Sequence, residues 1–172
     1  DRITEDLKEA QIEVMGICLE STRVQSYMQR NQVPYLAFKD ITQALKHVMR
    51  IRRWLIEENV HVVHCHKSSD LRLTSLLKLV MPSIKVFYTD HMGGQRAKKS
   101  PYHRFAYGKV DRVLSISKAT HQRNVSNLPV PRDHVICLPH GVNINIYRPC
   151  YDDETVRTKR SELGIPEGAV AI

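Results

Sequence analysis

Short apolar runs alternate along this chain with longer segments whose apolar residues recur every three or four positions. Short runs rich in β-branched residues are typical of buried strands, and the longer repeat is typical of amphipathic helices. The runs predict strands at Ile12–Cys18, Val33–Phe38, Val60–Cys65, Ile84–Thr89, Arg112–Ser117 and His134–Pro139. The repeats predict helices at Thr22–Asn31, Ile41–Leu55, Leu71–Met81, Pro101–Gly108, Lys118–Asn127 and Val156–Leu163.

This strict alternation of strands and helices predicts an α/β fold. A strand that is followed by a helix and another strand usually forms a parallel pair, so we expect a Rossmann-like parallel sheet with helices on both faces. Ligands of such sheets bind at the carboxyl ends of the strands. Polar residues that directly follow a predicted strand are therefore the first candidates for a functional site.

The composition is that of a globular protein with a strong basic excess. Of 172 residues, 42% are hydrophobic and 26% are charged, which is enough for one domain with a core. The net charge of +8 favours partners such as phosphorylated substrates, an anionic membrane surface or nucleic acid. No apolar run approaches the roughly 20 residues that span a bilayer. The four cysteines show no paired spacing, so a reducing cytoplasm is the simplest compartment.

The segment Lys109–Pro149 combines a strand, a serine-tipped turn, a helix, a second strand and a glycine turn that leads to an aromatic residue and a proline. This order resembles the end of the N-terminal domain of family 4 glycosyltransferases, where a VD-x-V-x-x-x-S strand is followed by a (P)-x-G-V-(D/N)-x-x-x-(F/Y)-x-P turn. The matching residues are Val110, Asp111, Val113, Ser117, Pro139, Gly141, Val142, Asn143, Tyr147 and Pro149. The resemblance is clear from Val60 to Pro149 and looser before Val60.

The resemblance implies the N-terminal half of an enzyme with the two-domain GT-B fold. Such enzymes move a sugar from a nucleotide-sugar donor to a glycan or lipid-linked acceptor, such as a lipopolysaccharide core. They retain the anomeric configuration and need no bound metal or cofactor. A second domain mainly holds the donor. The cysteine usage and the net charge of +8 predict a cytoplasmic protein that binds peripherally to an anionic membrane.

The resemblance also implies that the chain is a fragment. Residues 1–149 would form the acceptor-binding domain, and residues 150–172 a linker and the first strand of the donor domain, at Ala169–Ile172. In the family, a strand and a glycine-rich loop precede the first helix, whose apolar stripe here is Ile3, Leu7 and Ala10. Without that strand, two strand edges would lack a partner. We expect the fragment alone to be inactive.

Candidate site residues follow the predicted strands. The runs Val62–Asp70 and Phe87–Gly94 resemble family strand ends that carry histidines, which implies a catalytic role for His91 and a substrate contact for His66. Imidazole can donate to a sugar hydroxyl or orient an acceptor near neutral pH, and a glycine pair would let the next loop move over the substrate. Further expected substrate contacts are Lys67, Gly93, Gly94, Arg96, Lys98, Lys99, Ser117, Gly141 and Asn143.

Other interpretations stay open from the sequence alone. The histidines could line a cleft or fill the core, the basic loop could be a solvated surface, and Ser117 could serve only as a helix N-cap. A zinc site is disfavoured because His64, Cys65 and His66 are adjacent strand residues that cannot converge on one metal. The alternative function is a non-enzymatic basic module that binds nucleic acid or anionic surfaces. Nucleic acid is disfavoured because no motif for it is recognised and aromatic residues make up only 6%.

Overall fold

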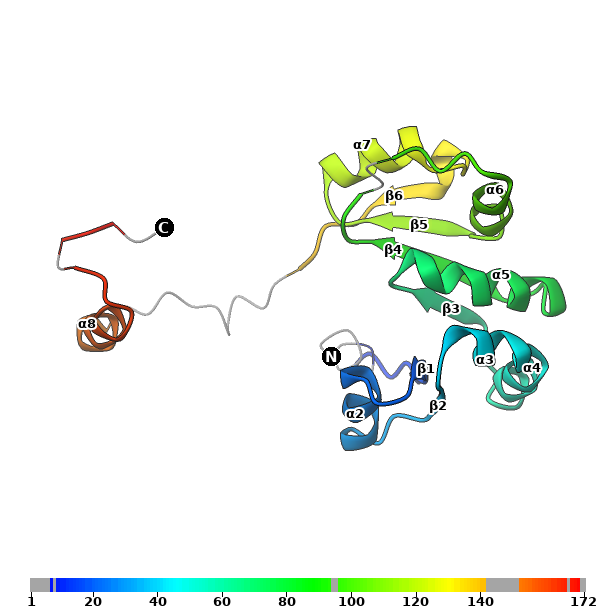
Figure 1. The fold of residues 1–172 in the computed structure, drawn as a ribbon, viewed down its shortest axis with the longest axis horizontal. Helices are drawn as coiled ribbons and strands as arrows, with labels where there is room; N and C mark the ends of the chain where they lie inside the picture. The colour runs from blue at the N-terminus through cyan, green and yellow to red at the C-terminus, as the bar shows by residue number, and fades with distance from the viewer. Residues whose placement is uncertain (1–6, 8, 94–95, 142–151, 167, 171–172) are drawn as a thin grey trace. The chain divides into compact units, whose positions relative to one another are not determined.

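The computed structural model describes residues 7, 9–93, 96–141, 152–166 and 168–170. The chain divides into two units, residues 1–139 and residues 140–172. The first unit carries parallel sheets with helices on both faces, so the predicted α/β fold is confirmed (Figure 1). In the second unit, the described residues form one helix, α8 (Asp153–Glu162), and Ala169 and Val170 are not in a strand. Gly94, Asn143 and the Tyr147–Pro149 part of the family turn lie outside the described residues.

The strands of the first unit form two sheets in which every neighbouring pair is parallel. One sheet pairs β1 (Gly16–Leu19) with β2 (Tyr35–Phe38). The other has the order β3 (Val62–Cys65), β4 (Lys85–Asp90), β5 (Arg112–Ser115) and β6 (Val135–Cys137). Among the described residues, β1 pairs only with β2 and β3 only with β4, so each has one edge without a partner strand.

Most helices begin and end close to their predicted bounds because the sequence supplies the signals for them. Hydroxyl side chains accept a backbone N–H of the first turn in three helices. Thr22 caps α2 (Arg23–Arg30), Ser100 caps α6 (Pro101–Tyr107) and Ser117 caps α7 (Lys118–Asn127). A short 3₁₀ turn, Ser68–Asp70, leads into α5 (Leu71–Val80), which ends before Pro82.

The single helix predicted from Ile41 to Leu55 is wrong, because the structure has two helices. α3 (Ile41–Lys46) ends at His47, and α4 (Val48–Glu57) begins immediately after it. His47 has non-helical backbone angles, φ −101° and ψ 19°, and its Nδ1 lies 2.8 Å from the carbonyl oxygen of Gln43. The imidazole thus contacts a carbonyl of the last turn of α3. The apolar period continues across this break, so periodicity alone cannot reveal it.

The first strand is also shorter than predicted. The apolar run begins at Ile12, but β1 begins at Gly16. Gln11 has a positive φ of 59°, and Ile12 is 51% exposed. A strand needs a neighbour for its backbone groups, and only Gly16–Leu19 finds one, in β2. Residues 12–15 are therefore not part of β1, although they continue the apolar run, because no neighbouring strand pairs with them.

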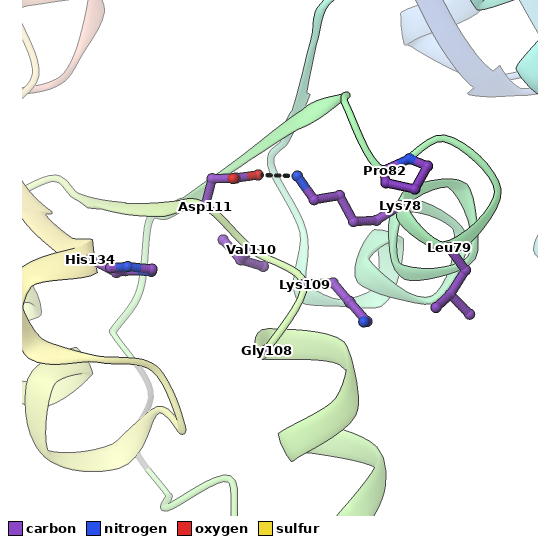
Figure 2. A pocket seen from close by; sticks show the side chains of 8 residues that line it. All are labelled: Lys78, Leu79, Pro82, Gly108, Lys109, Val110, Asp111 and His134. Atoms are coloured by element: carbon purple, nitrogen blue, oxygen red, sulfur yellow. Dashed lines mark hydrogen bonds and ion pairs between the residues drawn. The ribbon is translucent and has the colours of Figure 1, made fainter.

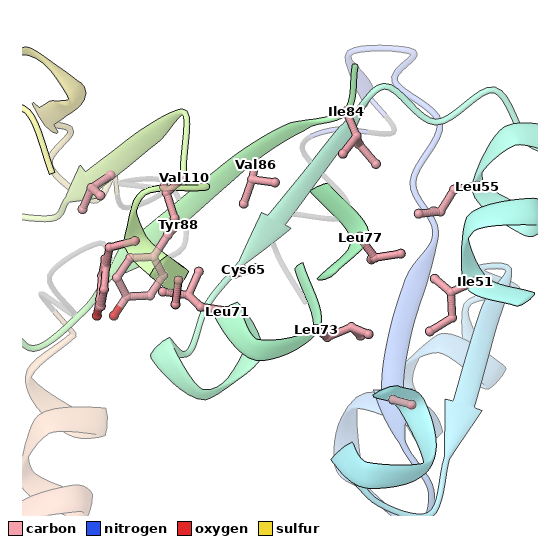
Figure 3. Packing of buried hydrophobic residues seen from close by; sticks show 14 of the residues in the cluster. Ile51, Leu55, Cys65, Leu71, Leu73, Leu77, Ile84, Val86, Tyr88 and Val110 are labelled. Atoms are coloured by element: carbon pink, nitrogen blue, oxygen red, sulfur yellow. The ribbon is translucent and has the colours of Figure 1, made fainter. Parts of the chain in front are cut away.

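Helix α5 lies at the centre of the hydrophobic core and contacts α3, α4, α6 and β4. Leu77 is completely buried and belongs to the same cluster as Ile51 and Leu55 of α4 (Figure 3). Val86 and Tyr88 of β4 complete the cluster on the side of the sheet. This packing fixes β3 and β4, which carry the candidate histidines, to the helices beside them.

An ion pair ties α5 to the amino ends of β4 and β5 (Figure 2). Asp111 Oδ2 accepts hydrogen bonds from Lys78 Nζ and from the backbone N–H of Val86, both at 2.8 Å, and Lys85 Nζ lies 3.6 Å from Oδ1. Burial alone would raise the pKa of Asp111, but these hydrogen bonds and the two lysines lower it below its ordinary value. Asp111, the aspartate of the VD-x-V-x-x-x-S pattern, therefore has a structural role in this fold.

Replacing Asp111 with alanine should destabilise the fold by about 2 kcal/mol, because a charged group loses its hydrogen bonds and Lys78 loses its counter-ion. Since the folded pKa lies below the unfolded value of about 4, this stabilisation is present above that pH and is lost as the pH falls through the folded pKa. Urea unfolding at about pH 7 and about pH 2 measures both effects. Asp133→Ala, which removes an exposed carboxylate, is the control and should change stability by less than about 0.5 kcal/mol. Equal losses in the two variants would contradict a structural role for Asp111.

Two surface hollows lie away from the carboxyl ends of the strands. One, of about 370 Å³, is lined by the Lys78–Asp111 pair together with Lys109 and His134 (Figure 2). The other, of about 450 Å³, lies beside residues 11–15. Neither is lined by His66 or His91. The candidate site is therefore formed by the residues at the carboxyl ends of β3 and β4 rather than by either hollow.

Candidate functional site

Three histidines gather at the carboxyl ends of β3 and β4. These strands are parallel neighbours, with Cys65 opposite Tyr88, so the residues that follow them meet at one edge of the sheet. His66 Nδ1 lies 3.4 Å from His91 Nε2, and the two rings stack with centroids 5.7 Å apart. His64 lies beside His66 at a centroid distance of 4.3 Å. The structure thus brings together the two histidines that the sequence places at separate strand ends.

The ring of His64 contacts the neighbouring strand. Its Nε2 lies 2.7 Å from Thr89 Oγ1 of the neighbouring strand. Burial lowers the pKa of His64 to about 4, and the nearby His66 and His91 contribute in the same direction. His64 is therefore neutral at neutral pH and acts as a support for the ring of His66. All three histidines keep exposed surface, and His66 and His91, beyond the last residues of the strands, can meet a ligand.

Asp90 fixes the turn that presents His91. This carboxylate is only 7% exposed, and its Oδ1 accepts the backbone N–H groups of Met92 and Gly93, each at 3.0 Å. Both bonds hold the chain in a tight turn directly after β4. The sequence does not single out Asp90, because a carboxylate that accepts backbone N–H groups two and three residues later belongs to no motif recognised there.

Gly93, the described member of the glycine pair, packs closely against helix α7. Gly93 is buried and has a φ of +72°, in the region that glycine adopts without strain. A Cβ at this position would lie 3.2 Å from Arg123 Cδ and 3.5 Å from Thr120 Cα of α7. The glycine therefore allows the loop to pack closely against the first turns of α7.

Ser117 uses its hydroxyl within the start of α7. Its Oγ accepts the backbone N–H of Thr120 at 3.1 Å and donates to Thr120 Oγ1 at 3.0 Å. One turn further, Asn124 Nδ2 donates to Ser115 Oγ at 3.0 Å, and both residues are completely buried. Sequence reasoning missed this pair, since Asn124 is visible only as part of an N-x-S pattern. The pair anchors α7 to the carboxyl end of β5.

The basic residues of the loop before α6 do not join the histidines. The backbone N–H of Lys98 donates to the carbonyl of Asn127, the last residue of α7, at 2.8 Å. Gly93 lies by Thr120, and the seven residues from Thr120 to Asn127 rise about 10 Å along α7, so Lys98 lies near the end of this helix that is farther from Gly93. Figure 1 shows the connection running along α7 toward α6. A contact of Lys98 or Lys99 with a substrate held at His91 has no support from this geometry.

The remaining expected contacts are dispersed. Lys67 is exposed just after His66 and is the one basic side chain of the expected set next to the histidines. Arg96 is exposed between Gly93 and Lys98, and Gly141 is exposed in the second unit. Within the described ranges, no three His, Cys, Asp or Glu side chains gather to hold a metal ion. In the same ranges, no helix has both the length and the apolar character that a bilayer crossing requires.

Comparisons with known proteins identify the family from the sequence and support the fold from solved structures. Residues 1–146 match the sequence profile of Glycosyltransferase Family 4. No match is found among the curated proteins. Among solved structures, a glycosyltransferase from Rickettsia africae ESF-5 has a TM-score of 0.75 at 15% identity, over 97% of this chain and 45% of that chain.

Two further solved structures share the fold. HepE from Anabaena, in complex with UDP-glucose, has a TM-score of 0.60 at 13% identity, over 88% of this chain and 50% of that chain. The lipopolysaccharide outer core galactosyltransferase WaaB, in its apo form, has a TM-score of 0.50 at 12% identity, over 81% of this chain and 50% of that chain. The chain therefore spans about half the length of these proteins.

Proposed function

This chain belongs to glycosyltransferase family 4, and we propose that it is the acceptor-side half of a retaining glycosyltransferase. The enzyme moves a hexose from a nucleotide-sugar donor to a glycan or lipid-linked acceptor of the lipopolysaccharide or cell-surface polysaccharide type. The observation that carries the proposal is the His66–His91 pair, exposed where two parallel strands of the family fold end. The UDP-glucose complex of HepE and the name of WaaB support the donor and acceptor classes.

The histidine pair is suited to positioning the reacting groups. In the transfer, the acceptor oxygen forms a bond to the anomeric carbon, and the bond from that carbon to the nucleoside diphosphate breaks. The diphosphate leaves with the electron pair and takes up the proton that the acceptor hydroxyl loses. His91 donates to or accepts from a hydroxyl beside this centre. His66 orients the His91 ring through the 3.4 Å contact, and neutral His64 supports His66 from its other side. In this proposal, Lys67, which is exposed directly after His66, meets an anionic group of the acceptor.

The proposed transfer uses no bound metal or cofactor, and the nucleotide-sugar is a substrate. The stereochemical part of the proposal has its own test. NMR coupling at the anomeric proton of the product should show the configuration of the donor. An inverted product would overturn the retaining mechanism but leave the transferase assignment in place.

The 172-residue chain alone should not turn over any nucleotide-sugar. Stabilisation of the leaving diphosphate is a large part of catalysis in such a transfer. In the proposed division, the donor side of the site belongs to a second half, and this chain covers only 45% of the length of the similar glycosyltransferase. Release of nucleoside diphosphate from a panel of nucleotide-sugars measures this, with the full-length protein as the positive control. Turnover by the chain at rates above about 1 per second, ordinary for enzymes, would contradict the division into acceptor and donor halves.

We further propose that the enzyme works at the cytoplasmic face of an anionic membrane as a peripheral protein. The net charge of +8 supports this location, because each basic residue near an anionic surface contributes about 1 kcal/mol. Such binding should weaken with added salt.

A further inference from the structure

The facing ring nitrogens of His66 and His91 have the spacing of two zinc ligands. Zinc binds imidazole nitrogen at about 2.0–2.1 Å in tetrahedral geometry, and two such ligands lie about 3.3–3.4 Å apart. His66 Nδ1 and His91 Nε2 are 3.4 Å apart. Two ligands at the right angle of a square-planar or octahedral site would lie only about 2.9 Å apart. The spacing of the pair therefore favours a tetrahedral ion.

The sequence does not reveal this pair, because the two histidines are 25 residues apart. Sequence reasoning disfavours zinc at residues 64–66, since adjacent strand residues cannot converge on one ion. The fold offers a different combination. The parallel register of β3 and β4 places His66, after one strand, beside His91, after the other.

The surrounding residues hold the two imidazoles near this geometry. The ring of His66 packs beside His64, whose Nε2 lies 2.7 Å from Thr89 Oγ1 and so links the two strands. The turn after β4 is held by Asp90, whose Oδ1 accepts two backbone N–H groups. A metal ion would meet two ligands that the fold has already brought together, which lowers the entropy cost of binding.

The local charge admits a cation, although the chain as a whole carries +8. Residues 64–70 and 86–93 contain one lysine, Lys67, and two aspartates, Asp70 and Asp90, so with neutral histidines these segments carry a net charge of −1. In the part of the chain that the structure describes, no third His, Cys, Asp or Glu completes a metal site. Water or a small molecule would therefore fill the remaining positions, as in zinc sites that keep an open position.

We propose that His66 and His91 form a two-ligand binding site for Zn²⁺, and that the bound ion closes the candidate substrate site. The ion takes the lone pairs of His66 Nδ1 and His91 Nε2, in the tautomers that carry the N–H on the other ring nitrogen. This nitrogen of His91 then no longer serves a substrate hydroxyl, so zinc inhibits the transfer and takes no part in it. The binding stands on the histidine geometry alone, whereas the inhibition rests on the proposed function.

Competition with a chromophoric zinc indicator tests the site in the full-length protein, purified without a histidine tag. We expect half-saturation between about 1 and about 200 µM Zn²⁺, since the site has half the ligands of a structural zinc site. Affinity should fall at least about tenfold in His66→Ala and in His91→Ala, because even the loss of an outer partner costs that much. Mg²⁺ should not compete, because it prefers oxygen ligands.

His61→Ala is the control for the loss of a histidine. His61 is exposed but precedes β3, at the amino end of the sheet, so its loss should change zinc affinity less than about twofold. Zinc should also raise the thermal midpoint of the wild type and of His61→Ala, but not that of His66→Ala/His91→Ala. The midpoints without metal confirm that each variant is folded.

Inhibition is measured on the transfer reaction. Zn²⁺ should lower the rate of the wild type over the concentration range in which it binds, and a chelator should restore the rate. His66→Ala should need at least about tenfold more Zn²⁺ for the same fractional loss.

Zinc affinity that is unchanged in both folded histidine variants would overturn the site, as would an equal loss in His61→Ala. Binding by the pair without inhibition of an active enzyme would overturn the closure of the substrate site. The indicator titration needs no nucleotide-sugar, so a failure of the proposed transferase activity would leave its outcome unchanged.

Discussion

Replacing His91 with alanine in the full-length enzyme is expected to lower kcat about 30- to 1,000-fold and to leave thermal stability almost unchanged. His91 is exposed and held by the turn that Asp90 fixes, so its removal disturbs little packing. A hydrogen bond that strengthens in the transition state is worth about 2–4 kcal/mol. Measuring kcat and the thermal midpoint on the same preparation separates a role in transfer from a role in packing.

His61→Ala is the matched control for this experiment. His61 is also exposed, but it directly precedes β3, at the amino end of the sheet. Its loss should leave kcat within about twofold of wild type, since it is remote from the strand ends where the reaction is proposed. Near-wild-type kcat in a folded His91→Ala variant would remove His91 from the site and leave His66 as the next candidate.

Replacing Leu77 with alanine should have the largest effect on stability, a loss of about 3–5 kcal/mol. Leu77 has no exposed surface and lies in the cluster that joins α4 and α5 to β4, so the vacated volume cannot be filled by small movements. Urea unfolding of the chain measures the loss. Leu79→Ala, two residues along the same helix and 50% exposed, should cost less than about 1 kcal/mol. Similar losses in the two variants would mean that α5 buries a different face.

The fold class and most helices follow from local signals in the sequence. The bounds of α7 were predicted to the residue, because Ser117 is an N-cap and Pro129 follows shortly after the helix. The break at His47 was missed because a side chain, rather than a proline or glycine, competes for a carbonyl there. The start of β1 was missed because burial of Ile12 depends on a neighbouring strand, which a local pattern does not contain.

The candidate site was predictable only in part. A histidine after each of two strands is visible in the sequence, and their contact follows once β3 and β4 are parallel neighbours. The path of the chain after Gly93 was not predictable, since nothing in its composition says that it packs along α7. Lys98 and Lys99 therefore looked like neighbours of His91, although the fold takes them to the far end of that helix.

We propose that this chain supplies the acceptor side of a sugar transfer at the ends of β3 and β4. The most direct test is transfer of labelled sugar from a nucleotide-sugar panel to glycan and lipid extracts by the full-length protein, with and without His66→Ala/His91→Ala. We expect labelled product with at least one donor and at least about a 30-fold lower rate in the folded double variant. Labelled product formed equally fast by the double variant, or no labelled product with any donor from a folded enzyme, would contradict it.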